Sequence, residues 1–168
     1  FAHRARQSEA KSRPLYSSAT ATAGATVRLD GNDFLNLGQP EALDFAPGDP
    51  YTVVVVYRVS GKNSGTFVAK GGGEAGQRAY QCYVAPGRLG AIAYGIMQEK
   101  IVSPGANVAV YRCDGSRVDV SVADRPVFSF TVGKGSSDVD VLIGARRKNV
   151  DNTDIFYPLT GDLTEILI

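Results

Sequence analysis

The stretch Tyr51–Val59 reads YTVVVVYRV and is the most apolar segment of the 168-residue chain. Valine and tyrosine favour extended strands, because β-branched and aromatic side chains pack well on a pleated surface. Nine residues suit a strand and fall far short of the roughly 20 that a membrane-spanning helix needs. Because the run is apolar at both odd and even positions, we expect a central strand covered on both faces.

Turn residues divide the rest of the chain into further short strands. Pro86-Gly87-Arg88 separates Ala79–Ala85 from Leu89–Tyr94, and Asp114-Gly115-Ser116 separates Val108–Cys113 from Arg117–Val122. Both patterns are typical of hairpins. The other expected strands are Thr26–Leu29, Phe34–Leu37, Thr66–Ala69, Val127–Val132, Val139–Gly144 and Leu163–Ile168. About ten or eleven strands without a convincing helix predict an all-β sandwich or barrel.

Composition and charge exclude several classes of protein. Hydrophobic residues make up 43% of the chain, which is enough for one sizeable core, and 18 basic residues stand against 17 acidic ones. A net charge of +1 argues against a nucleic-acid binder and against a polybasic membrane-surface protein. We therefore expect neither a nucleic-acid partner nor a membrane partner.

Residues 1–24 differ from the remainder and predict an extended basic arm before a domain at residues 25–168. Four basic residues and one acidic residue give this segment a charge of +3, and a Ser/Thr/Ala-rich stretch follows at residues 17–23. The arm residues expected to dock the domain on a larger assembly are Arg4, Arg6, Lys11 and Arg13. A disordered tail is the alternative.

The two cysteines, Cys82 and Cys113, either pair or are buried free thiols. A disulfide needs an oxidising compartment, which the sequence does not specify. We favour free thiols in the core, because an isolated cysteine behaves as a small hydrophobic residue.

Several segments together resemble the laminin-G-like, concanavalin-A-like jelly-roll group, which includes bacteriophage virion surface proteins. They are Val27–Gly38, Tyr51–Val59 with Gly65–Gly71, Val108–Val122, Leu142–Arg146 and Leu159–Ile168. The resemblance covers residues 25–168 and implies a two-sheet antiparallel jelly-roll sandwich. It also implies that Val27 and Leu29 lie beside the closing strand Leu163–Ile168. The tryptophans common in the group are missing, and Tyr57 and Tyr111 lie near their places.

The sequence offers no convincing catalytic set, so we expect that the protein is not an enzyme. A retaining glycanase needs two carboxylates about 5 Å apart. The nearest match is Asp138 with Asp140, which lacks a third acid, while Asp119 is alone in its strand. The single histidine, His3, lies in the arm, where nothing positions it as a base.

Two loops carry the mixture of planar polar groups and aromatic rings that binds sugars. The first runs from Gly71 to Tyr80 and the second from Arg146 to Tyr157. The candidate glycan or partner contacts are Glu74, Gln77, Arg78, Tyr80, Arg146, Arg147, Asn149, Asp151, Asn152 and Asp154.

We predict no cofactor and no metal site. Calcium is the usual ion of the jelly-roll group, and Asp151, Asn152 and Asp154 could supply oxygen ligands. The basic run from Arg146 to Lys148 opposes a cation there.

Our leading hypothesis is a non-catalytic surface-display module of a bacteriophage virion, either a decoration or a fibre protein. In this hypothesis the arm docks the domain on other virion proteins and the domain is oligomeric in the assembly. The alternative is an extracellular carbohydrate-binding module of a secreted or cell-surface protein.

The arm hypothesis makes the first prediction. A variant that lacks residues 1–24 should fold as a sandwich but no longer join its assembly, because four basic side chains suit an acidic groove on a neighbouring subunit. Native mass measurement of the assembly tests this. Unchanged affinity of the truncated protein in moderate salt would show that the arm is not the docking element.

Overall fold

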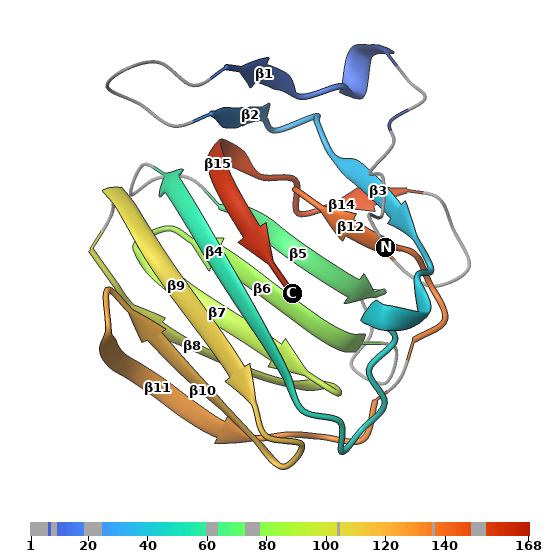
Figure 1. The fold of residues 1–168 in the computed structure, drawn as a ribbon, viewed down its shortest axis with the longest axis vertical. Helices are drawn as coiled ribbons and strands as arrows, with labels where there is room; N and C mark the ends of the chain where they lie inside the picture. Colours follow the sequence, from blue (N-terminus) through green and yellow to red (C-terminus); the bar gives the residue numbers. More distant parts are fainter. Residues whose placement is uncertain are drawn as a thin grey trace.

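The computed structural model describes residues 7, 10–18, 25–59, 64–72, 78–103, 105–135, 137–148 and 154–168. Two large antiparallel sheets pack face to face in this part of the chain (Figure 1), which confirms the predicted sandwich. The helical elements of the described residues are two short 3-10 turns, η1 (Ala10–Ser12) and η2 (Glu41–Leu43). No helix among the described residues is long and apolar enough to cross a membrane.

One sheet has seven strands in the order β1-β2-β15-β4-β9-β10-β11. Their bounds are β1 Leu15–Ser17, β2 Thr26–Asp30, β15 Thr160–Leu167, β4 Tyr51–Val59, β9 Gly105–Cys113, β10 Arg117–Val122 and β11 Arg125–Thr131. The central position of Tyr51–Val59 is confirmed. The predicted pairing of the terminal strands is confirmed as well, because Val27 lies opposite Leu163 and Leu29 opposite Gly161.

The second sheet has six strands in the order β3-β12-β5-β6-β7-β8, and β13 pairs with β14 in a separate two-stranded sheet. Their bounds are β3 Leu35–Gly38, β12 Val141–Ile143, β5 Gly65–Gly71, β6 Arg78–Ala85, β7 Arg88–Ala93, β8 Ile96–Ile101, β13 Arg146–Arg147 and β14 Ile155–Phe156. The sequence analysis did not predict β8, because its residues IMQEKI include three consecutive polar ones and so show no strand alternation.

The expectation that β4 is covered on both faces is wrong. Alternate residues from Tyr51 to Val59 are buried, but Thr52 and Arg58 on the opposite face are exposed, and Val54 and Val56 are only half-buried. The reason is that one face of the seven-stranded sheet packs on the six-stranded sheet, while the other is an outer surface (Figure 1).

Aromatic rings fill the space between the two sheets. Tyr57 of β4 and Phe67 of β5 have ring centroids 4.6 Å apart, and Tyr51 of β4 lies 5.6 Å from Tyr80 of β6. Both cysteines are buried free thiols, which confirms the favoured prediction. Burial raises the pKa of Cys82 and of Cys113, so both stay protonated at neutral pH.

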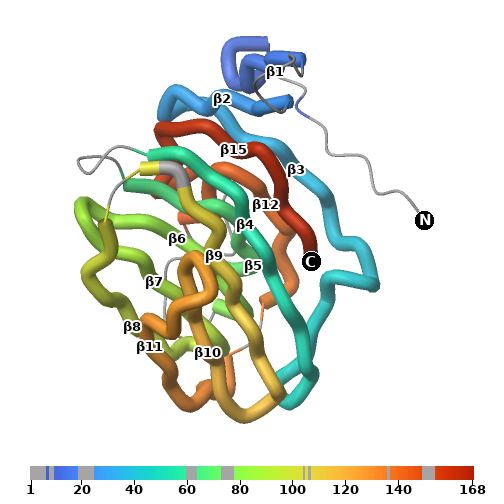
Figure 2. Tube along the Cα trace, turned by 60° about the vertical axis from the view of Figure 1, so that its left-hand side comes forward, coloured from blue at the N-terminus to red at the C-terminus, as the bar shows by residue number. Residues whose placement is uncertain are grey.

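Part of the arm lies on its own sandwich. Strand β1 pairs with β2, placing Tyr16 opposite Val27 at one end of the seven-stranded sheet (Figure 2). Leu15 and Tyr16 are 69% and 70% exposed, so backbone pairing rather than side-chain burial forms this strand, and no alternation in the sequence indicated it. Arg13 donates from Nε to the carbonyl of Gln7 at 3.0 Å. Lys11 is exposed, and Arg4 and Arg6 lie outside the described residues.

The ring of Phe67 should contribute strongly to stability. Phe67 is fully buried against Tyr57, so we expect Phe67→Ala to lower the free energy of unfolding by about 3–5 kcal/mol. The control Ile101→Ala removes a side chain that is 77% exposed and should change it by less than about 0.5 kcal/mol. Urea unfolding followed by circular dichroism measures both, and equal effects would contradict the assigned core.

Candidate functional site

Side chains along β6 alternate between the core and the outer face of the six-stranded sheet. Tyr80, Cys82 and Val84 belong to the main core. Tyr83 and Ala85 instead form a separate small apolar cluster with Ile92 of β7, against which Tyr157 packs. The outer face of this sheet therefore has an aromatic centre of its own.

Three aromatic rings line this outer site. Tyr83 and Tyr157 meet edge to face, with centroids 6.1 Å apart and an interplanar angle of 79°. Phe156 of β14 follows at 5.8 Å from Tyr157, and its side chain is 44% exposed. Tyr83 is therefore the buried ring of the site, and Phe156 is the ring that is exposed to solvent.

Glycine at position 90 makes room for the buried ring. A Cβ built on Gly90 would lie 2.1 Å from Cζ of Tyr83, well inside van der Waals contact. Gly90 is directly opposite Tyr83 in the β6–β7 ladder. The Tyr83 ring therefore occupies the space that a side chain at position 90 of β7 would need.

Arg146 lies above these rings. Its guanidinium carbon is 4.8 Å from the centroid of Phe156 and 5.9 Å from that of Tyr157, within the range of cation–π contact. Nη1 donates to the carbonyl of Gly72 at 3.3 Å. The Nε atom is buried and meets no acceptor among the described residues, so this donor of the guanidinium has no hydrogen bond there.

A second arginine, Arg78 at the start of β6, is close enough to affect Arg146 electrostatically. Burial lowers the pKa of Arg146, and the positive charge of Arg78 lowers it further. Burial also lowers the pKa of Arg78. Both arginines are half-buried, so their mutual repulsion is less screened than on an open surface. An anion bound between them would relieve this repulsion.

The nearby acid, Glu99 of β8, is committed to other partners. Its Oε1 accepts from Nη1 of Arg88 at 2.5 Å, and its Oε2 accepts from the hydroxyl of Tyr83 at 3.2 Å. Burial raises the pKa of Tyr83, and the Glu99 carboxylate raises it further. Tyr83 is therefore a neutral hydrogen-bond donor at physiological pH.

The structure thus brings together Arg78 and Arg146, which the sequence placed in two different loops. Sequence reasoning missed Tyr83, Glu99, Arg88 and Phe156. Tyr83 was hidden because β6 is apolar at both odd and even positions, so that its two faces could not be told apart. Phe156 precedes Tyr157 at the end of the predicted second loop, and this was the one signal that could have located it.

Other predicted contacts have different roles. Tyr80 as a ligand contact is wrong, because it is 1% exposed, packs against Tyr51 and donates to the carbonyl of Leu43 at 3.3 Å. Arg147 forms an ion pair with Asp140 at 3.2 Å. Asp154 is exposed, and its carbonyl accepts from the backbone N–H of Lys148 at 3.0 Å.

The remaining candidates, Glu74, Gln77, Asn149, Asp151 and Asn152, lie outside the described residues. The described part of the chain contains no group of three or more His, Cys, Asp or Glu residues that could hold a metal. Calcium binding by Asp151 and Asn152 stays untested.

The acids considered for catalysis have structural partners or lie at the surface. Asp140 accepts from Nδ2 of Asn36 at 2.7 Å as well as from Arg147. Asp138 is exposed, and its carbonyl accepts from Nε2 of Gln39 at 2.7 Å. The lone acid Asp119 pairs with Arg117 at 2.8 Å. Asp119 and Asp140 are thus ion-pair partners of neighbouring arginines in this structure.

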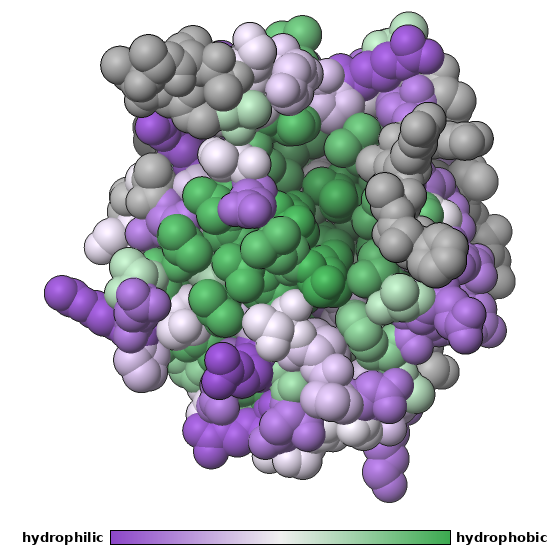
Figure 3. Space-filling model, viewed as in Figure 1, coloured by the Kyte–Doolittle hydropathy of each residue, from purple (hydrophilic) through white to green (hydrophobic). Residues whose placement is uncertain are grey.

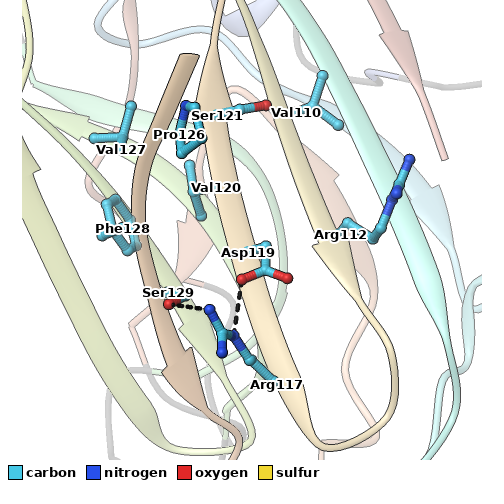
Figure 4. A pocket seen from close by; sticks show the side chains of 10 residues that line it. All are labelled: Val110, Arg112, Arg117, Asp119, Val120, Ser121, Pro126, Val127, Phe128 and Ser129. Carbon is cyan, nitrogen blue, oxygen red and sulfur yellow. Dashed lines mark hydrogen bonds and ion pairs between the residues drawn. The ribbon is translucent and has the colours of Figure 1, made fainter. Parts of the chain in front are cut away.

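A hollow of about 490 Å³ lies on the outer face of the seven-stranded sheet over β9, β10 and β11 (Figure 4). Arg117 donates to Asp119 at 2.8 Å and to Ser129 at 2.7 Å, so these polar groups largely satisfy one another. The hollow is open, and Phe128, stacked on Phe130, is the aromatic ring among its lining residues, against three rings around Arg146. The six-stranded face is therefore the stronger candidate for a polar ligand.

Comparison with known proteins supports the fold. No protein-family model matches the sequence, and no curated protein matches it significantly. Among solved structures, the CBM40 module of a Ruminococcus gnavus IT-sialidase, bound to alpha2,3 sialyllactose, has a TM-score of 0.60 at 14% identity over 84% of this chain and 87% of that chain. A second structure of the same module gives the same TM-score of 0.60 at 14% identity.

Laminin domains are similar as well. Domains LG4-5 of the mouse laminin alpha1 chain give a TM-score of 0.56 at 9% identity, over 84% of this chain and 41% of that one. The LG1-3 region of the laminin alpha2 chain gives 0.56 at 12% identity, over 84% and 30%. The predicted concanavalin-A-like, laminin-G-like jelly roll is confirmed at the level of fold. The bacteriophage setting stays a prediction.

The close approach of Gly90 and Tyr83 gives a prediction for the site. We expect Gly90→Ala to displace the Tyr83 ring and to lower the free energy of unfolding by about 1–3 kcal/mol, as overpacking does. In a Tyr83→Ala background the same substitution should be nearly neutral, because the clashing ring is gone. Urea unfolding of the four proteins measures the coupling, and an equal cost in both backgrounds would contradict it.

Proposed function

We propose that this chain is a non-catalytic carbohydrate-binding module that holds an acidic glycan on the outer face of its six-stranded sheet. The observation that carries the proposal is the half-buried Arg146 guanidinium, which lies over two aromatic rings beside a second arginine. This is the function that the sequence analysis held as its alternative.

The aromatic rings suit the apolar part of a sugar. The C–H groups on one face of a pyranose pack on an aromatic ring, and Phe156, 44% exposed beside Tyr157, offers accessible ring surface. The sugar hydroxyls then need planar polar partners around the ring. Arg88, which is bonded to Glu99 beside Tyr83, has further guanidinium donors that can serve as such partners at the rim.

The arginines suit an acidic substituent. A guanidinium offers a fork of donors that matches a carboxylate or sulfate, and such charge-assisted bonds are about twice as strong as neutral ones. Burial and the charge of Arg78 both disfavour the bare Arg146 cation, so a negative ligand gains more here than on an open surface. A neutral glycan would leave this repulsion in place.

The fold neighbours support a binding role. The Ruminococcus gnavus module is bound to alpha2,3 sialyllactose, an oligosaccharide with a carboxylate, which is the ligand chemistry proposed here. At 14% identity the two proteins share a fold, so the site itself rests on this chain's own residues. A glycan ligand also fits the extracellular setting of the alternative hypothesis.

The virion hypothesis has less support. The described strand of the arm pairs with β2 of its own chain, which accounts for the position of that segment without a partner. The proposed role of Arg4, Arg6, Lys11 and Arg13 in an assembly remains a hypothesis.

Isothermal titration with acidic and neutral oligosaccharides tests the proposed function. We expect Arg146→Ala to weaken binding of a carboxylated or sulfated glycan about 10- to 100-fold, the usual loss for a hydrogen bond to a charged group. Arg146→Lys should recover part of the affinity, because it keeps the charge and loses the fork. The control Arg125→Ala, at the exposed start of β11, should bind as the wild type does.

Unchanged melting temperatures must accompany these results, so that a loss of binding is not a loss of fold. Absence of binding to every acidic glycan in the panel, or equal binding by the wild type and Arg146→Ala, would refute the proposed function.

A further inference from the structure

The outer face of the seven-stranded sheet carries an apolar patch, which we define by Val54 and Val56 of β4, Val108 and Val110 of β9, and Leu167 of β15. Register places Val54 opposite Val110 and Leu167, and Val56 opposite Val108, so the five side chains are neighbours. Val108 is 41% and Leu167 54% exposed. Figure 3 shows the patch as a continuous apolar area at the centre of this face. Contiguous areas of this kind mark interaction surfaces.

Two charged residues of opposite sign lie at opposite corners of the patch. Arg112 is paired across the ladder with Thr52, and Glu165 is paired with Val56. Both side chains are exposed, and neither bonds to another described residue. In Figure 4, Arg112 stands apart from the Arg117–Asp119–Ser129 group. These two corners of the patch therefore carry charges of opposite sign. Arg58, two residues beyond Val56 on β4, is a further exposed cation of the same face.

Strand geometry places Arg112 and Glu165 on opposite sides of Val54, at equal distances from it. Thr52 and Val56 are four residues apart on β4, or about 13 Å, and β9 and β15 flank β4 at about 5 Å on either side. The diagonal from Arg112 to Glu165 therefore has its midpoint at Val54, in the centre of the patch. A two-fold axis through Val54, in the plane of the face and perpendicular to this diagonal, exchanges the two corners.

We propose that a second copy of this chain docks on the patch, sheet against sheet, in an isologous dimer. Such a dimer needs a surface that is complementary to itself. The two-fold axis places Arg112 of each copy against Glu165 of the other copy and buries both patches. A partner of uniform charge or an anionic membrane would meet one favourable corner and one unfavourable corner, which is why the second copy is the better occupant.

The dimer leaves the six-stranded sheets on its two outer sides. Each copy's Arg146 site then faces solvent, and the pair is bivalent. If the proposed function holds, two sites on one particle bind a multivalent glycan surface more tightly than one site does. The dimer itself rests on the seven-stranded face alone and can be tested without any glycan.

Charge reversal tests the dimer by sedimentation equilibrium over a concentration series. Arg112→Glu and Glu165→Arg, each alone, should raise the dimer Kd by about tenfold or more, because each places like charges together in both symmetry-related contacts. The double variant Arg112→Glu/Glu165→Arg should recover the wild-type Kd. Val108→Asp should also abolish the dimer, while the control Lys100→Glu, on the exposed strand β8, should leave it unchanged.

Far-ultraviolet circular dichroism and urea unfolding confirm that each variant is folded. A wild-type chain that stays monomeric at every concentration would overturn the proposal. Single reversals that leave the Kd unchanged would also overturn it. Weaker dimers in both single variants without recovery in the double variant would overturn it as well, because the two charges would then not face each other.

Discussion

The packing of β4 against β5 and β6 is the contact on which the rest of the structure depends. Tyr57 meets Phe67 at one end and Tyr51 meets Tyr80 at the other, so large rings set the spacing between the two sheets. Because side chains alternate along a strand, each inward residue fixes the direction of its neighbours. Holding Tyr80 and Cys82 in the core therefore holds Tyr83 on the outer face.

The candidate site follows from that alternation together with one short hairpin. The β13–β14 pair lies against β5 and brings Arg146, Phe156 and Tyr157 over the outward side of β6. Gly90 lets the Tyr83 ring lie close to the backbone beneath. The result is a half-buried cation on an aromatic base, an arrangement in which desolvation favours an anionic ligand.

The two outer faces of the sandwich have different chemistry and suit different partners. The six-stranded face has two neighbouring arginines and the exposed ring of Phe156, which fit a polar, acidic ligand. The seven-stranded face has a valine-rich centre with Arg112 and Glu165 at opposite corners, which fits a copy of itself. Since the faces point in opposite directions (Figure 1), occupation of one does not obstruct the other.

The sequence by itself determined most of the strands, the hairpin turns and the sandwich class, because period-two patterning and hairpin residues are local properties. It favoured free cysteines but left their pairing open, and β1 and β8 carried no pattern that predicted them. It also located Arg78 and Arg146 in chemically suitable loops. The tertiary structure alone decided that β4 has an exposed valine face, that Tyr80 lies in the core while Tyr83 lies at the site, and that the two arginines are close neighbours. Those outcomes depend on which strands pair and which sheet covers which face. Strand pairing and sheet packing join residues that are far apart in the chain, so no local sequence pattern predicts these contacts.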